Sequence, residues 1–434
     1  MKLNKLFLLA AMGLGLFACN NNDLVEGSAP NGTQEEGTTY VGFTIDFGEN
    51  KTRATKDATA EESKINTAYV ILADGNTISQ IVSEADKESG KYVLQTTPGS
   101  HDFYVVVNPK TAPTTKNTVD EYFNSGVTIE ASEFADITTP SFLMASEAKN
   151  TFDIAEGITK DQAIAGTDYT TNSFTINVER VAAKVTMTCE NPVLTDKNGG
   201  EAGGTISDMA FNLYGGATMA YRMRQNPFAE ITGNAWSYSV NNKTVATSLD
   251  NITLNNNVAY CLENIHDAAT EYKTGNTTYL TLYTKFQPTN VVDCADEIKA
   301  LKPNTQPAGS SFYVVKEGEF AGNYIMKADL DAYQAIDGNT GKLPAGVNVL
   351  SEEYENGVCW FGPIWIGQTA TDLEHAPVVR NTWYNLKISG ITLPGDPEPP
   401  TIDDPDQPLN PPTFVAITLT VMPWNFIDRE ITLQ

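Results

Sequence analysis

The chain has 434 residues, five cysteines and a formal net charge of −26, from 54 acidic and 28 basic residues. This length can supply several hydrophobic cores, so two or more domains are expected. The strong negative charge argues against nucleic acid or an anionic membrane as the main partner. Five scattered cysteines are too few for a disulfide-rich scaffold. Plentiful Thr, Asn, Gly, Val and aromatic residues, with few long amphipathic helical runs, predict an all-β chain.

Residues 1–19 have the features of an export signal. A positive start is followed by an apolar run over residues 6–16, which is shorter than the roughly 20 residues that span a bilayer. The run leads to Phe17-Ala18-Cys19, a pattern typical of a lipobox, in which cleavage leaves Cys19 to be acylated. The alternative is an ordinary signal peptide with an incidental cysteine. Both interpretations export the protein.

Residues 20–53 are expected to form a propeptide. Its first part, residues 20–38, is polar and glycine-rich, and it lacks the apolar surface needed to fold. A strand is expected at residues 39–47, because its apolar residues share one face at the period of two. These apolar residues are Val41, Phe43, Ile45 and Phe47. The polar run after this strand contains Arg53 and predicts an exposed loop that is open to proteolysis.

Residues 54–182 are expected to form a first β-sandwich, because short strands recur there between turns. The expected strands cover residues 65–72, 91–96, 101–108, 142–145 and 173–178, with a short helix at 119–124. The segment 178–187 is expected to connect this sandwich to the next.

Residues 183–393 are expected to form a second β-sandwich. The expected strands are 205–214, 258–263, 278–286, 311–315 and 382–392, with short helices at 294–301 and 327–335. Four cysteines could pair after export, but we expect them to be small apolar residues buried in the sheets. They are Cys189, Cys261, Cys294 and Cys359.

A proline-rich linker is expected at residues 394–412, followed by a strand-forming segment at residues 413–434. In that segment alternate apolar residues share one face. They are Val415, Ile417, Leu419 and Val421, and Pro423-Trp424 follows them. At about 3.1 Å per residue the linker would reach roughly 50–60 Å. A good strand on a stiff tether suggests that it pairs with another molecule.

The sequence offers little for catalysis or metal binding. It has only three histidines, no H-E-x-x-H or C-x-x-C spacing, no G-x-S-x-G elbow and no P-loop. Paired carboxylates arise by chance among 54 acidic residues, and no D-x-D-x-D-G run for calcium is present. We therefore expect no enzymatic activity, no metal and no cofactor.

Several segments resemble the fimbrillins of Bacteroides-type anaerobes, which build type V pili, and the minor-fimbrium shaft subunits above all. No single motif carries the resemblance, which rests on the order and spacing of several segments. In chain order these are Cys19, the strand before Arg53, residues 178–185, 260–264 and 378–386, the proline-rich linker, and Pro423-Trp424.

The resemblance implies two transthyretin-like β-sandwiches in series, an extended C-terminal donor segment, and a mechanism of assembly. A lipidated precursor reaches the outer membrane, and an arginine-specific protease cuts between Arg53 and Ala54. The strand at residues 39–47 is then removed, and a C-terminal strand from a neighbouring copy fills its groove. The implied partners are further copies, accessory anchor and tip subunits, the protease and surface receptors. The implied location is a cell-surface fimbrium that supports adhesion.

Three alternatives stay open. A tip subunit has the groove but donates no strand, and an anchor subunit keeps its lipid and its first strand. A third alternative is a glycan-binding surface lipoprotein that uses exposed aromatic residues such as Trp360 and Trp365. The intact linker and Arg53 favour the shaft subunit, and packing in a core is the more ordinary role for the tryptophans.

Overall fold

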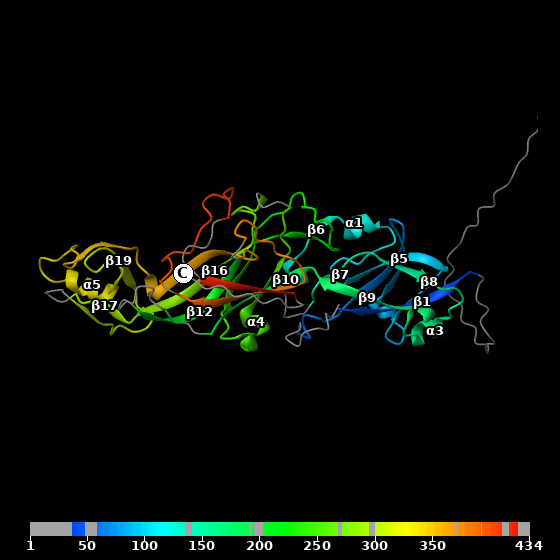
Figure 1. Cartoon of the computed structure of the whole chain (residues 1–434), viewed down its shortest axis with the longest axis horizontal. Coiled ribbons are helices and arrows are strands. Elements are labelled where there is room, and N and C mark those ends of the chain that lie inside the picture. Colours follow the sequence, from blue (N-terminus) through cyan, green and yellow to red (C-terminus); the bar gives the residue numbers. More distant parts are fainter. Residues whose placement is uncertain are drawn as a thin grey trace, which may run out of the picture.

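The computed structural model describes residues 37–47, 59–134, 141–190, 193–194, 203–267, 271–294, 300–369, 372–391, 393–409 and 416–423. Its elements are mostly β-strands, and groups of them follow one another along an elongated molecule (Figure 1). This confirms the all-β architecture expected from composition. In the part of the chain covered by these ranges, no helix has the length and hydrophobicity needed to cross a bilayer.

The first group of strands forms one sheet that folds over to enclose a core. Its strands are β1 (Thr39–Asp46), β2 (Ala68–Asp74), β3 (Thr77–Ser83), β4 (Tyr92–Thr96), β5 (Gly99–Val107), β7 (Met144–Ser146), β8 (Asn150–Ile154) and β9 (Ser173–Arg180). The strand order is β3-β2-β5-β7-β9-β1-β4, and β8 pairs with β5. The two ends of this path approach each other, since Gln80 Nε2 of β3 donates a hydrogen bond to the Gln95 carbonyl oxygen of β4 at 3.0 Å.

Aromatic packing joins the two layers of this first sandwich. The ring of Phe43 in β1 lies 4.6 Å from the ring of Phe103 in β5. The rings of Phe152 in β8 and Phe174 in β9 each lie 6.0 Å from the ring of Phe43. Such tilted contacts add to the hydrophobic free energy of burial. Phe43 is therefore placed at the centre of the first core.

Short helices cover this sandwich, namely α1 (Val119–Phe123), α2 (Ala131–Phe134) and α3 (Lys160–Ala165). α1 and α3 each begin at a capping box, in which a threonine and the residue three positions later exchange hydrogen bonds. The helix expected at residues 119–124 is thus confirmed as α1. Strand β6 (Gly126–Thr128) pairs with β13 (Met219–Tyr221), which belongs to the second half of the chain.

The second group of strands forms two sheets packed face to face. Its elements are β10 (Ala182–Cys189), β11 (Val193–Leu194), β12 (Gly204–Gly216), β14 (Tyr238–Thr244), α4 (Leu254–Asn257), β15 (Val258–Leu262), β16 (Tyr279–Pro288), β22 (Val358–Trp365), β23 (Thr382–Gly390) and β24 (Ala416–Pro423). One sheet has the order β15-β10-β23-β24, and the other has the order β11-β12-β16-β22 with β14 beside β12. Cys189, Cys261, Cys294 and Cys359 are buried, as expected.

A smaller group of elements extends the second sandwich at the far end of the molecule (yellow in Figure 1). It contains β17 (Asn290–Val292), β18 (Leu301–Pro303), β19 (Phe312–Gly318), β20 (Tyr324–Met326), α5 (Lys327–Gln334) and β21 (Val347–Leu350). The helix expected at residues 327–335 is confirmed as α5. The helix expected at residues 294–301 falls largely outside the described residues, and its last residue, Leu301, begins β18.

The two sandwiches meet where β9 is joined to β10 through Val181 alone. A buried ion cluster lies at this junction. Glu62 Oε1 is 2.8 Å from Lys184 Nζ and accepts a hydrogen bond from the Tyr260 hydroxyl at 2.6 Å. Arg180 Nε donates to the Glu62 carbonyl oxygen at 2.9 Å. All four residues are at most 4% exposed, so the cluster fixes the segment around Glu62 to both sandwiches.

The partners of Glu62 hold the pKa of its carboxylate low. Burial raises this pKa, but attraction to Lys184 and hydrogen bonds from Lys184, Tyr260 and the Thr59 N–H lower it below its ordinary value. Burial lowers the pKa of Lys184 more than Glu62 raises it. A carboxylate with a lower pKa in the folded chain stabilises the fold above its unfolded pKa. That contribution is lost as the pH falls through the folded pKa.

Glu62→Gln should lower the free energy of unfolding by about 3–5 kcal/mol, because it leaves Lys184 buried without its counter-charge. The wild-type chain should lose this advantage as the pH falls below 4.5, the ordinary pKa of the carboxylate. Urea unfolding of both chains at a series of pH values measures the two effects. Glu61→Gln, at the exposed neighbour, is the matched control. Equal losses in the two variants would contradict the role of the cluster.

Candidate functional site

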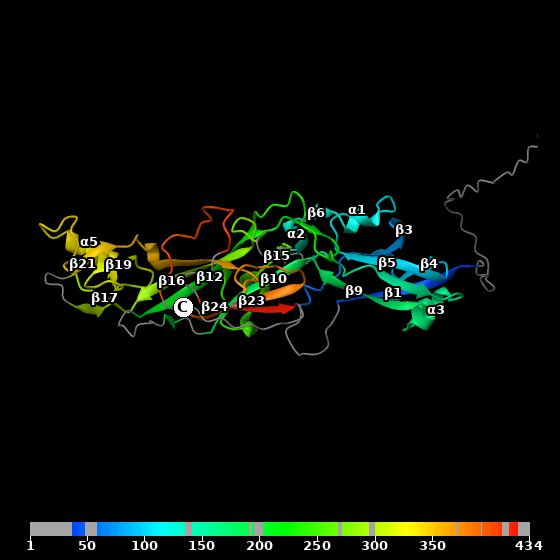
Figure 2. The same cartoon turned by 45° about the horizontal axis from the view of Figure 1, so that its top comes forward.

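β1 lies in the interior of the first sheet, between β4 and β9 (Figure 2). It runs antiparallel to β4, with Thr39 opposite Thr96, and parallel to β9, with Asp46 opposite Asn177. It pairs with β4 over residues 39–43 along one edge and with β9 over residues 42–46 along the other. Removal of β1 would leave a gap between β4 and β9, which we name the β1 slot, with unpaired backbone groups on both sides.

The inner face of the β1 slot is apolar. Val41 and Phe43 have no exposed surface, and Ile45 and Phe47 are half-buried against the same core. The predicted alternation of these four residues is confirmed. Each such side chain contributes roughly 1.5–3 kcal/mol when it is fully buried. An emptied slot would therefore expose a hydrophobic groove.

A buried hydroxyl occupies one end of the slot. Thr39 is 0% exposed, and its Oγ1 donates a hydrogen bond to the Ala155 carbonyl oxygen at 2.8 Å. The same atom accepts from the Ile158 N–H at 3.1 Å and from Asn172 Nδ2 at 3.3 Å. We name Ala155, Ile158 and Asn172 the hydroxyl pocket. Apolar side chains cannot satisfy these three partners, so the pocket is specific for a hydroxyl group.

Asn172 builds the hydroxyl pocket from an unusual backbone conformation. Its φ of +49° is left-handed, which asparagine tolerates better than most residues. Its Oδ1 accepts from the Ala155 N–H at 2.8 Å, and its Nδ2 donates to the Tyr40 carbonyl oxygen at 3.0 Å. This residue could not be predicted from sequence, because its partner Thr39 lies 133 positions away. No local pattern marks it.

Helix α3 covers the outer face of β1 at Gly42. A Cβ atom at Gly42 would lie 2.6 Å from the Ala163 carbonyl oxygen in α3, so any residue larger than glycine requires α3 or β1 to shift. Lys91 holds α3 in place, since its Nζ donates to the Ala163 carbonyl oxygen at 3.2 Å and to Ser173 Oγ at 2.6 Å. Burial lowers the pKa of Lys91. The slot is thus shaped on its outer face as well.

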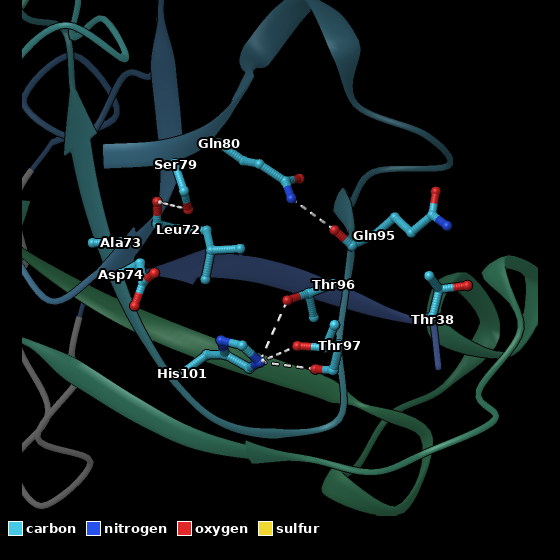
Figure 3. Close-up of a pocket in the computed structure, with 10 residues that line it drawn as sticks. All are labelled: Thr38, Leu72, Ala73, Asp74, Ser79, Gln80, Gln95, Thr96, Thr97 and His101. Carbon is cyan, nitrogen blue, oxygen red and sulfur yellow. Dashed lines mark hydrogen bonds between the residues drawn. The ribbon is translucent and has the colours of Figure 1, made fainter. Parts of the chain in front are cut away.

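A cavity of about 640 Å³ borders the start of β1 (Figure 3). It is lined by Thr38, Leu72, Ala73, Asp74, Ser79, Gln80, Gln95, Thr96, Thr97 and His101. His101 Nε2 lies 2.8 Å from the Thr97 carbonyl oxygen, so this nitrogen carries the hydrogen and donates it. The cavity lies beside Thr38, the residue before β1, and so marks the mouth of the slot.

β24 lies at the edge of the second sandwich, antiparallel to β23 (Figure 2). The strand expected in the C-terminal segment is therefore confirmed at residues 416–423. On the backbone, Ile417, Leu419 and Val421 stand opposite residues of β23. Among the strands that the structure describes, β23 is the sole neighbour of β24.

The remaining residues expected at the site lie outside the described ranges. They are Cys19, Arg53, Ala54, Val415 and Trp424. Within the ranges that are described, no group of three or more histidine, cysteine, aspartate or glutamate residues is placed to hold a metal ion.

The proline-rich linker is held against the second sandwich over residues 393–409, which corrects the expectation of a detached tether. Asp396 and Trp360 exchange two backbone hydrogen bonds of 2.8 Å. Farther along, the Gly275 N–H donates to the Pro405 carbonyl oxygen at 2.9 Å. A proline-rich segment keeps its carbonyl acceptors and its other N–H groups, so it can dock through its main chain.

The two tryptophans considered for glycan binding do not form an exposed aromatic surface. Trp365 is 3% exposed, and its ring lies 5.3 Å from that of Tyr279. Trp360 is half-buried, and its ring lies 5.1 Å from that of Tyr283. The suggestion that both are exposed is therefore wrong for Trp365, and packing accounts for both residues.

The C-terminal part of the chain matches a known protein family. The family of the major fimbrial subunit protein type IV, fimbrillin, C-terminal, matches residues 352–430. Two curated relatives, each a Minor fimbrium subunit Mfa1 of Porphyromonas gingivalis, are 24% identical, and each match covers 51% of this chain and 46% of the relative. The chain thus spans about half the length of the curated relatives it matches.

Similar solved structures include a fimbrilin, FimA, from Porphyromonas gingivalis W83, with 17% identity, a TM-score of 0.48, and 91% of this chain and 99% of that chain covered. A putative cell adhesion protein from Bacteroides eggerthii has 15% identity and a TM-score of 0.45, with coverages of 92% and 97%. The tip fimbrial protein Mfa3 from Porphyromonas gingivalis has 12% identity and a TM-score of 0.42, with coverages of 88% and 99%.

Fimbrial subunits are structural proteins and not enzymes, which agrees with the expectation of no catalysis. The family match over residues 352–430 and the curated relatives confirm the resemblance seen in the sequence, and the chain is similar to fimbrillins.

Proposed function

We propose that the chain is a shaft subunit of a cell-surface fimbrium and polymerises by exchange of strands between copies. An arginine-specific protease cuts between Arg53 and Ala54, β1 leaves, and residues 413–421 of another copy fill the β1 slot. The observation that carries the proposal is the position of β1, which is interior to the sheet and directly precedes the segment with the arginine. The fimbrial relatives support the same role.

The energetics of the β1 slot support strand exchange. Ordering about nine residues costs on the order of 1–2 kcal/mol each in backbone entropy. Burying four apolar side chains returns roughly 1.5–3 kcal/mol each, so the two contributions nearly cancel. A donor strand therefore stays bound only where a preformed groove also supplies backbone hydrogen bonds. The β1 slot supplies them on both sides, which is the arrangement known as β-augmentation.

The edge position of β24 supports its role as the donor. It pairs with β23 along one side. A strand that moves from this edge to the β1 slot exchanges eight backbone pairs with β23 for five with β4 and five with β9. The slot therefore replaces the pairing that the donor gives up and adds burial of the donor's apolar face.

The remaining parts of the proposal concern assembly at the cell surface. The lipobox at Cys19 supports a lipidated precursor at the outer membrane before the protease acts. Each copy would donate one strand and accept another through a different surface. Such head-to-tail contacts do not close, so they build a filament. Accessory anchor and tip subunits would terminate it, and the finished fimbrium would support adhesion.

Arg53→Ala should leave export intact and block polymerisation, because β1 then stays covalently attached in its slot. Gels that resolve heat-labile polymers, and electron microscopy of the cell surface, measure the outcome. Lys56→Ala is the matched control, since an arginine-specific protease does not recognise lysine, and it should polymerise normally. Normal filaments from Arg53→Ala, without a new cut nearby, would contradict the processing step.

A chain that ends at Leu409 should remain a monomer, because it keeps the β1 slot but lacks the donor segment. Mixed with the full-length chain, it should accept a strand and then stop growth, so filaments should shorten as its share rises. Filament length by electron microscopy at several mixing ratios measures this effect. Polymers formed by the shortened chain alone would refute the donor role of residues 413–421.

A further inference from the structure

The C-terminal segment reproduces β1 position by position. Residues 39–47 read Thr-Tyr-Val-Gly-Phe-Thr-Ile-Asp-Phe, and residues 413–421 read Thr-Phe-Val-Ala-Ile-Thr-Leu-Thr-Val. The identical pairs are Thr39 with Thr413, Val41 with Val415, and Thr44 with Thr418. The other apolar residues of the inner face also fall at matching positions. The likeness therefore includes direction and register as well as general strand character.

We propose that residues 413–421 of a second copy enter the β1 slot in the direction of β1, with Thr413 in the place of Thr39. The donor then runs antiparallel to β4 and parallel to β9. This inference rests on the strand exchange proposed above. It adds the direction, the register and the side chains that recognise the donor. The recognised group is the hydroxyl of Thr413, and the hydroxyl pocket binds it.

The hydroxyl pocket is the first argument for this register. When Thr39 leaves, the Ile158 N–H loses its acceptor. The Asn172 amide and the Ala155 carbonyl oxygen each lose one partner and keep the hydrogen bond of 2.9 Å between them. A buried polar group that loses its partner destabilises the protein more than a new hydrogen bond stabilises it. Thr413 restores all three interactions, because it has the same side chain at the same point of the strand.

The outer face of the slot is the second argument. At Gly42 a Cβ would lie 2.6 Å from the Ala163 carbonyl oxygen, so the donor needs its smallest residue here. The proposed register places Ala416, the smallest residue of the donor, at this point, and its Cβ requires α3 or the donor backbone to shift. Two residues after Gly42, Thr44 Oγ1 lies 3.0 Å from Thr175 Oγ1. In the proposed register Thr418 replaces Thr44 and makes the same contact.

Other directions and registers of the donor fit neither the hydroxyl pocket nor the position of Gly42. A donor that runs in the opposite direction, with its apolar residues inward, places Pro423 in the hydroxyl pocket and Thr420 at Gly42. A shift of two residues along the proposed direction places Val415 in the hydroxyl pocket and Thr418 at Gly42. In each case the pocket loses its hydroxyl, and a branched side chain meets the Ala163 carbonyl oxygen.

The cavity beside Thr38, at the start of the β1 slot, can hold the two prolines that precede the donor segment. In the proposed register, Pro411 and Pro412 arrive beside the place of Thr38, at the cavity shown in Figure 3. Proline has no N–H and adopts an extended backbone, so it suits the end of a strand, where ladder pairing stops. The cavity of about 640 Å³ leaves room for both rings.

Disulfide trapping in the full-length chain tests the direction. Asn177→Cys with Thr420→Cys should form disulfides between copies, because Thr420 takes the place of Asp46, opposite Asn177. Gln95→Cys with Met422→Cys is the matched control for the reverse direction, in which Met422 would take the place of Tyr40, opposite Gln95. Denaturing gels without reductant should show a ladder for the first pair alone. The four native cysteines described are buried, so they give little background.

A pair of matched substitutions tests the register. Thr413→Val should make polymers dissociate about tenfold to a hundredfold faster on heating, because it leaves the Ile158 N–H of the hydroxyl pocket without its acceptor. Thr420→Val is the same chemical change at a donor position that would replace Asp46, which is exposed. It should alter the rate of polymer dissociation by less than about twofold. Gel ladders sampled over time at a fixed temperature measure both rates.

The outcomes separate this inference from the strand exchange beneath it. Absence of any polymer from the protease-treated, unsubstituted chain would overturn strand exchange and the register together. Polymers that crosslink through Gln95→Cys and Met422→Cys would overturn the direction alone. Equal effects of Thr413→Val and Thr420→Val would overturn the register, while strand exchange would stand.

Discussion

Backbone hydrogen bonding along both edges of β1 is the constraint on which the first sandwich depends. A strand inside a sheet cannot leave without uncovering N–H and C=O groups on two neighbours, here β4 and β9. The loss of Val41 and Phe43 would uncover the apolar core at the same time. In the proposed exchange, departure of β1 would therefore be coupled to arrival of another strand, which would cover the same groups again.

The ion cluster at the junction complements this constraint. Glu62 follows Arg53 by a short stretch of chain, and Lys184 and Arg180 hold it between the two sandwiches. The chain after the proposed cut is thus fixed by buried charges, whereas β1 before the cut is held by its ladder and its apolar face. A single cut would separate β1 from the segment around Glu62. β1 could then leave while the buried charges keep the junction in place.

Sequence patterns predicted β1, α1, α5 and the strand in the C-terminal segment, because the pattern of apolar and polar residues is a local signal. They missed β22, in which a Gly362-Pro363 step interrupts the strand pattern. They also missed Asn172 and Lys91, whose roles depend on partners far along the chain. The linker seemed free for the same reason, since its docking uses backbone groups that composition does not reveal.

The docked linker has a mechanical consequence. Residues 410–412 alone separate its last described residue, Leu409, from the proposed donor segment. At about 3.1 Å per residue this stretch reaches roughly 12 Å. A copy that donates its strand with the linker still docked must therefore press against its neighbour. Bending a filament of such copies would compress one side of each contact and open the other, so the filament would resist load as a stiff rod.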